Sequence, residues 1–235
     1  MLYVTFCYAP DAEMLKMAST RIRELDSEAV IYAVNDAAKP IRETIDGVVF
    51  LSSDFPRGGN LNGLAVVAGE LAMFDRLLRK EGADFIVKFD CDLWANDLTP
   101  FLRTLPENGQ EVPDYLSVER FEAFKPSGMI YRLSRWMVAR LLELFNARSK
   151  AELWTKGLYP EDLTIYNLAQ QTRLLCELIP FASGYTAGMH DGGPGTYGDA
   201  VKAGVVHCGE PLPNGARVTR EHATLRMKII KSETK

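Results

Sequence analysis

The chain has 235 residues, of which 47% are hydrophobic and 25% are charged, as in an ordinary globular protein. Its length fits one α/β domain of generous size. The formal net charge of −4 provides no basic surface of the kind that binds nucleic acid, so we expect no nucleic-acid partner.

The sequence indicates a cytoplasmic protein. The first residues, MLYVTFCYAPD, lack the basic region and long apolar core of a signal peptide. We find no apolar run of the roughly 20 residues that a transmembrane helix needs. The four cysteines are scattered without a CxxC pair, which argues against a zinc knuckle or a disulfide framework. We therefore expect reduced thiols, no transmembrane segment and, at most, peripheral association with a membrane.

The first half of the chain alternates strand-like and helix-like segments. Buried strands are expected at 2–8, 29–35, 47–53 and 84–90, and amphipathic helices at 10–25 and 64–80. Strands separated by helices of this length form a mostly parallel sheet with crossover connections. In such sheets ligands bind beyond the carboxyl ends of the strands.

The second half is less regular. Strands are expected at 114–118, 128–134 and 203–209, and helices at 135–148 and 160–171. The glycine-rich stretch 183–199 has no periodicity and is expected to be a loop. The basic tail from Arg217 is expected to be a surface helix. Because no repeat or low-complexity linker interrupts the chain, we expect one domain.

Two aspartates lie at the end of the strand expected at 84–90, in FIVKFDCDLWAND. Residues i and i+2 of an extended strand point the same way, so Asp90 and Asp92 can approach one ion together. Mg²⁺ and Mn²⁺ prefer carboxylate oxygen, and substrate phosphates commonly complete the coordination of Mg²⁺. The alternative is a solvated turn, but the position after a buried strand favours a metal. Asp97 is interpreted as the N-terminal cap of LTPFLRTL.

His207 also ends a short apolar strand, and a glycine follows two residues later. A neutral imidazole beside carboxylates suits Mn²⁺ better than Mg²⁺. The alternative is a partly buried, hydrogen-bonded histidine. We consider His207 a candidate third metal ligand.

Glu161 and Asp162 open the helix expected at 160–171. Carboxylates in a first turn stabilise the helix dipole and need no other function. Alternatively, Asp162 could take a proton from an attacking hydroxyl or bind acceptor hydroxyls. The sequence leaves both interpretations open.

The loop PRGGNLNG contains Arg57, Asn60 and Asn62 just ahead of a helix. Its backbone amides, together with Arg57, could receive phosphate or sugar hydroxyls. A plain connecting loop is the alternative. It is not a Walker loop, because no Gly-Lys-Ser/Thr follows.

In chain order, the segments YVTFCYAPD, VND, KFDCDLWANDLTPFL, SGMIYRLSRWMV, PEDLTIYNL and VVHCG resemble those of GT-A nucleotide-sugar glycosyltransferases. The resemblance runs from Leu2 to about Gly209, and the DxD segment is similar to that of the glycogenin-like and lipopolysaccharide galactosyltransferase group. Two features depart from the pattern: PLPNG follows HCGE where that group has Lys-Pro-Trp, and Asp36 follows an asparagine. The implied fold is a single Rossmann-like domain with a mixed, mostly parallel central sheet flanked by helices.

The resemblance implies a role for each candidate residue. Asp92 would bind the metal on the donor diphosphate, Asp90 would contact the ribose or the metal, and His207 would be the late-chain metal ligand. The positions that match contacts to the nucleotide base and ribose are Tyr8, Ala9, Pro10 and Asp36. The positions that match contacts to the donor are Arg57, Asn60 and Asn62. The position that matches the catalytic base of inverting members is Asp162, with Glu161 beside it; in a retaining enzyme, Asp162 would bind sugar or acceptor.

The implied activity is transfer of a sugar from a nucleoside-diphosphate sugar, expected to be UDP-linked, to a hydroxyl of a glycan, lipid or protein acceptor. Mn²⁺, or Mg²⁺, would be the cofactor. Residues 1–97 would form the nucleotide-binding half, 98–216 the acceptor-side half and 217–235 a basic tail.

Two alternatives remain open. Haloacid-dehalogenase-like phosphatases also place a DxD pair after a strand, although there the motif normally opens the domain and precedes Thr or Val, whereas Leu93 and Trp94 follow here. The other alternative is a catalytically silent nucleotide-sugar-binding module on the same scaffold.

Overall fold

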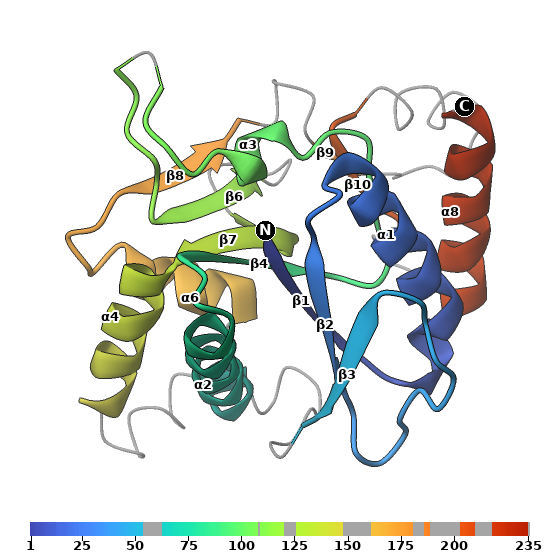
Figure 1. Ribbon diagram of the computed structural model, residues 1–235, viewed down its shortest axis with the longest axis horizontal. Helices are drawn as coiled ribbons and strands as arrows, with labels where there is room; N and C mark the ends of the chain where they lie inside the picture. Colours follow the sequence, from blue (N-terminus) through green and yellow to red (C-terminus); the bar gives the residue numbers. More distant parts are fainter. Residues whose placement is uncertain are drawn as a thin grey trace.

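The computed structural model describes residues 1–53, 63–107, 109–119, 126–147, 161–180, 186–188, 203–209 and 218–234, with the backbone alone for 63–65, 161–162 and 186–188. A seven-stranded sheet runs through the described part of the chain, and helices pack on both of its faces (Figure 1).

The central sheet has the strand order β3-β2-β1-β4-β7-β6-β8. Its strands are β1 (Leu2–Cys7), β2 (Val30–Asn35), β3 (Val48–Ser52), β4 (Phe85–Phe89), β6 (Tyr115–Glu119), β7 (Pro126–Ser134) and β8 (Cys176–Ile179). Within this set β7 alone runs antiparallel to its neighbours, β4 and β6; the other pairs are parallel. The expected mixed, mostly parallel sheet is confirmed.

The two faces of the sheet have separate hydrophobic cores, because side chains alternate along each strand. On β1, Tyr3 and Cys7 join the core beneath α1 (Ala12–Leu25) and α8 (Arg220–Glu233), whereas Val4 and Phe6 join the opposite core. That second core includes side chains of α2 (Gly63–Glu81), α4 (Arg135–Asn146) and α6 (Glu161–Ala169). Figure 1 shows α1 and α8 on one side of the sheet and the other three helices on the opposite side.

A smaller sheet covers part of the α1 face. It consists of β5 (Leu93–Ala95), β10 (Val205–His207) and β9 (Thr186–Gly188), in the order β5-β10-β9. The sequence prediction missed β5 and β8, and it was wrong about β9, which falls inside the expected loop 183–199. Such short strands are held by pairing with distant segments, so their own sequences carry little periodic signal.

The segment expected as a basic surface tail contributes to the core. In α8, Ala223, Met227 and Ile230 are buried at helical spacing, and the helix packs against α1. The side chain of Thr219 caps α8 by accepting a hydrogen bond from the amide of His222 (3.2 Å).

The prediction for Asp97 was wrong by one residue. The short helix α3 (Thr99–Leu102) has Leu98 at its N-cap position. Asp97 Oδ1 nevertheless accepts a hydrogen bond from the amide of Thr99 (2.8 Å), so the carboxylate still satisfies a free N–H group at the start of the helix. Asp97 therefore stabilises the start of α3, a structural role distinct from the proposed metal binding by Asp90 and Asp92, as the sequence suggested.

Candidate metal and donor site

Asp90 and Asp92 lie on a tight turn between β4 and β5. The amide of Asp90 donates to the carbonyl of Met129 on β7 (2.8 Å), and the amide of Leu93 donates to the carbonyl of Asp90 (3.0 Å). The two carboxylates therefore converge because of this turn. The expected reason, that residues i and i+2 of one extended strand point the same way, was wrong. The turn leaves both at the carboxyl end of β4.

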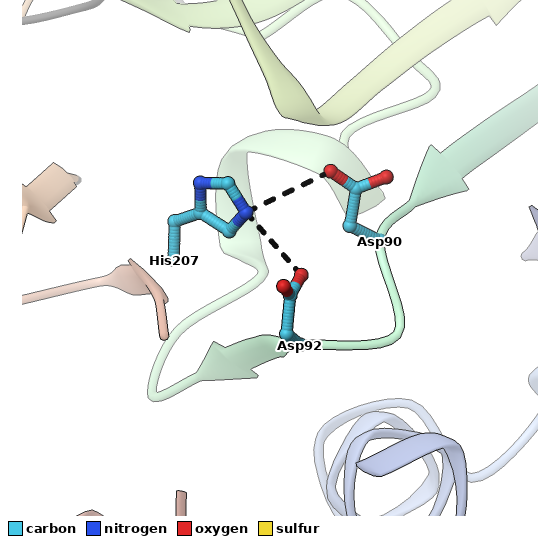
Figure 2. A group of neighbouring side chains, drawn as sticks. All are labelled: Asp90, Asp92 and His207. Carbon is cyan, nitrogen blue, oxygen red and sulfur yellow. Dashed lines mark ion pairs between the residues drawn. The ribbon is translucent and has the colours of Figure 1, made fainter. Parts of the chain in front are cut away.

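His207 reaches the same place through the small sheet. β10 pairs antiparallel with β5, which sets His207 opposite Leu93, and the amide of Cys208 donates to the carbonyl of Asp92 (2.9 Å). His207 Nε2 lies 3.3 Å from Asp92 Oδ1 and 3.9 Å from Asp90 Oδ2. Figure 2 shows the imidazole nitrogen facing both carboxylates.

The chemistry and spacing of these three side chains fit a divalent cation. Two carboxylate oxygens and one imidazole nitrogen lie within 4.8 Å of one another. In octahedral coordination with ligands about 2.1 Å from the ion, neighbouring ligands are about 3.0 Å apart and opposite ligands about 4.2 Å. The group could thus hold one Mg²⁺ or Mn²⁺ ion and leave coordination positions free for phosphate oxygens.

The backbone at Gly209 shapes the same site. A Cβ built at this position would lie 2.0 Å from Asp92 Oδ2 and 3.5 Å from His207 Nε2. Since real Cβ atoms do not approach an oxygen so closely, a larger residue would push the Asp92 carboxylate from its place. Glycine here lets the chain after β10 pass directly beside the carboxylate.

No protein-family model and no curated protein sequence matches the chain. Solved structures do. The chain resembles a glycosyltransferase involved in the glycosylation of the major capsid of PBCV-1, with a TM-score of 0.60 at 11% identity over 97% of this chain and 98% of the other. It also resembles the galactosyltransferase LgtC in complex with donor and acceptor sugar analogues (TM-score 0.55, 15% identity, 99% and 96% covered). A third match is the glycosyltransferase GlyE of Streptococcus pneumoniae TIGR4 (TM-score 0.54, 13% identity, 98% and 62% covered).

The chain has the GT-A glycosyltransferase fold. This confirms the fold expected from the sequence and the similarity to the lipopolysaccharide galactosyltransferase group. Within the residues that the structure describes, no helix of this GT-A domain is both long enough and apolar enough to span a membrane.

Arg220 is a site residue that the sequence analysis missed. It is the first residue of α8, and its Nη1 lies 3.2 Å from Asp92 Oδ2. Its Nε lies 3.2 Å from both the hydroxyl of Tyr8 and Oδ1 of Asp11. Arg220 therefore ties the end of β1 to the candidate metal group of the GT-A domain. No local motif marks it, because its neighbours are set by the docking of α8.

Charge around Asp92 favours its ionised form. Its side chain is 7% exposed, and burial alone would raise the pKa of this carboxyl. The attraction of His207 and Arg220 and the hydrogen bond from His207 outweigh burial and lower the pKa of Asp92 to about 2. A carboxylate that stays ionised is the state that a metal ligand requires.

Lys88 pairs with the other carboxylate. Its Nζ lies 2.7 Å from Asp90 Oδ1 and donates to the carbonyl of Gly128 (2.6 Å). Asp90 is more open than Asp92, with 36% of its side chain exposed. Lys88 was not predicted as a site residue either, although it stands two residues before Asp90 on β4.

The structure places the expected nucleotide-contacting residues at the carboxyl ends of β1 and β2. Tyr8, Ala9 and Pro10 follow β1, and the amide of Asp36 donates to the carbonyl of Cys7 (2.9 Å). Asp36 Oδ1 already accepts hydrogen bonds from the amides of Ala38 (2.7 Å) and Lys39 (3.2 Å). Arg220 donates hydrogen bonds to both Tyr8 and Asp92 and so links Tyr8 to the candidate metal group.

Two other sets of predicted residues are described less fully. The expected donor contacts Arg57, Asn60 and Asn62 lie outside the described residues. Glu161 and Asp162 begin α6, as expected, but their side chains also lie outside the described part of the structure.

Proposed function

We propose that the chain is a metal-dependent glycosyltransferase that moves a sugar from a nucleoside-diphosphate sugar, with UDP as the nucleotide, to an acceptor hydroxyl. The observation that carries the proposal is the convergence of Asp90, Asp92 and His207 at the carboxyl edge of a GT-A sheet. Two carboxylates and an imidazole are a ligand set for Mn²⁺, or Mg²⁺, that leaves positions open for a diphosphate.

The residues of the site divide into metal ligands and donor contacts. Asp90, Asp92 and His207 would hold the metal, whose charge, when bound, neutralises that of the departing diphosphate. The donor contacts, assigned by resemblance and by position, are Tyr8, Ala9, Pro10, Asp36, Arg57, Asn60 and Asn62, with Asp90 also within the proposed ribose-binding set.

Asp162 is the proposed catalytic residue, with Glu161 beside it. In an inverting reaction Asp162 would take the proton of the attacking hydroxyl, and in a retaining reaction it would bind sugar or acceptor. The support is its place in the first turn of α6. The acceptor class is a glycan, a lipid or a protein. Residues 98–216 would form the acceptor-side half and residues 1–97 the nucleotide-binding half.

We propose a cytoplasmic location, with peripheral membrane association at most. The support is that Cys7, Cys91, Cys176 and Cys208 are all free thiols in the structure. A hydrogen bond with Cys7, together with burial, raises the pKa of Cys91, and burial raises the pKa of Cys208. An unreactive, protonated thiol is typical of a buried structural cysteine.

Thermal-shift measurements with a panel of nucleotide sugars, with and without Mn²⁺, test the proposal. We expect stabilisation by one nucleotide in the presence of Mn²⁺ and none in Asp92→Ala. Asp46→Ala is the matched control, because the Asp46 side chain is fully exposed and pairs with Arg23 away from the metal group. Stabilisation that persists in Asp92→Ala would overturn the metal assignment.

Activity assays separate the remaining alternatives. The proposed enzyme releases nucleoside diphosphate from its donor, slowly by hydrolysis and faster with an acceptor. A silent binding module would be stabilised by nucleotide and metal without any release. A haloacid-dehalogenase-like phosphatase would hydrolyse p-nitrophenyl phosphate, which we expect this chain to leave intact.

A further inference from the structure

Each carboxylate of the candidate metal group has one oxygen bound to a basic side chain. Lys88 Nζ lies 2.7 Å from Asp90 Oδ1, and Arg220 Nη1 lies 3.2 Å from Asp92 Oδ2. The other oxygen of each carboxylate, Asp90 Oδ2 and Asp92 Oδ1, faces His207 Nε2. The two basic side chains thus flank the group on the sides away from the histidine.

Both basic residues are fixed within the fold. The Lys88 side chain is 6% exposed, donates to the carbonyl of Gly128 and lies over the ring of Tyr131, 5.5 Å from its centroid. Arg220 is anchored on its other side by the buried carboxylate of Asp11. Neither ion pair is therefore one between flexible surface side chains, a kind of pair that contributes little to stability.

The charges of the candidate metal group and its neighbours do not balance when a divalent cation is bound. Among the described residues, the carboxylates of Asp11, Asp90 and Asp92 pair with the basic side chains of Lys88 and Arg220. One negative charge is in excess in this set when His207 is neutral. A divalent cation would reverse this to one positive charge in excess. In a partly buried site that excess opposes the bare cation and attracts an anion.

We propose that Lys88 and Arg220 are counter-charges that make the site bind a divalent cation together with a diphosphate and only weakly without one. This rests on the proposed function, because it assigns specificity to the same metal group. The diphosphate supplies the negative charge that the cluster lacks once the cation is bound. Arg220 is 39% exposed, so its guanidinium is accessible to such an anion while it holds Asp92.

Calorimetric titration of the full chain with Mn²⁺, alone and at saturating UDP, tests this inference with the variant Arg220→Gln. Glutamine removes the charge but retains a hydrogen-bond donor for Asp92. We expect Arg220→Gln to bind Mn²⁺ alone about tenfold more tightly than the unsubstituted chain. We also expect UDP to tighten Mn²⁺ binding much less in the variant. Inorganic pyrophosphate in place of UDP should give the same difference, since the inference concerns the diphosphate.

Lys228→Gln is the matched control. Lys228 is also on α8 and pairs with Glu13 at the surface, so its loss removes the same charge from the same helix away from the metal group. It should leave both Mn²⁺ affinities unchanged. Lys88→Gln provides a second test, with the same expected direction as Arg220→Gln, should the latter chain fold poorly.

The outcomes separate the two proposals. If the unsubstituted chain binds Mn²⁺ neither alone nor with UDP, the proposed function fails and this inference fails with it. If that chain binds Mn²⁺ with UDP but the two glutamine variants bind bare Mn²⁺ no more tightly, the counter-charge role alone is overturned.

Discussion

Gly209 lies so close to Asp92 that a Cβ at position 209 would come within 2.0 Å of the carboxylate oxygen Oδ2. The same oxygen is bound by Arg220 at 3.2 Å. Asp92 is therefore confined between the backbone after β10 and the first residue of α8. Its other oxygen, Oδ1, faces His207. This orientation is the one that Asp92 needs to share a metal ion with His207.

Gly209→Ala should disturb the candidate metal group. The added methyl group would displace the Asp92 carboxylate, at a loss of about 1–3 kcal/mol in stability, as is usual for overpacking. Stabilisation by Mn²⁺ and nucleotide, measured by thermal shift, should disappear. Gly82→Ala is the control: Gly82 has φ of +63° but an open surrounding, so this variant should lose stability and keep the metal response.

His207→Ala should weaken binding of Mn²⁺ in the presence of UDP by at least the roughly 10–100-fold that loss of a residue supporting a metal ligand costs, because one of three proposed ligands is itself lost. Equilibrium titration of Mn²⁺ provides the measurement. His222→Ala, on α8 and outside the metal group, should bind like the unsubstituted chain. Equal affinity in His207→Ala and His222→Ala would remove His207 from the ligand set.

The lowered pKa of Asp92 predicts a pH dependence of stability in the metal-free protein. A carboxyl whose folded-state pKa is about 2 stabilises the fold above its unfolded pKa, and this stabilisation is lost as pH falls through the folded value. Asp92→Asn should therefore be less stable than the unsubstituted chain by about 2 kcal/mol at pH 7. Urea unfolding should show the difference unchanged at pH 5 and smaller at pH 3. A difference that shrinks already between pH 7 and pH 5 would contradict the assignment.

Met227→Ala tests whether α8 belongs to the core. Met227 is fully buried between α8 and the rest of its hydrophobic cluster, so the substitution should destabilise the chain by about 2–5 kcal/mol in urea unfolding. Leu225→Ala, two residues away with 52% of the residue exposed, should change stability by no more than about 0.5 kcal/mol. Similar small effects for both would mean that α8 is only a surface tail.

The sequence predicts the central strands well because their signal is local. β1, β2 and β4 are mostly apolar runs, and each was predicted within one residue of its ends. β5, β9 and β8 were not, because strands of three or four residues depend on distant partners. His207 was found because it ends a recognisable strand, although the pairing of β10 with β5 that carries it to Asp92 has no sequence signature.

The contact between Arg220 and Asp92 could not be predicted from the sequence. The basic pattern of the tail from Arg217 led us to expect a surface helix, and α8 occupies that segment. Nothing in that pattern tells which end of the helix meets the metal group. The contact with Asp92 arises from the packing of α8 on α1, which is a property of the whole fold.

The most direct test of the metal assignment is calorimetric titration of the chain with UDP, once with Mn²⁺ and once with a chelator in its place. We predict that UDP binds with Mn²⁺, that binding is lost with the chelator, and that Asp92→Ala does not bind UDP even with Mn²⁺. Equal binding of UDP with Mn²⁺ and with the chelator would contradict the claim that Asp90, Asp92 and His207 hold a metal on the donor diphosphate.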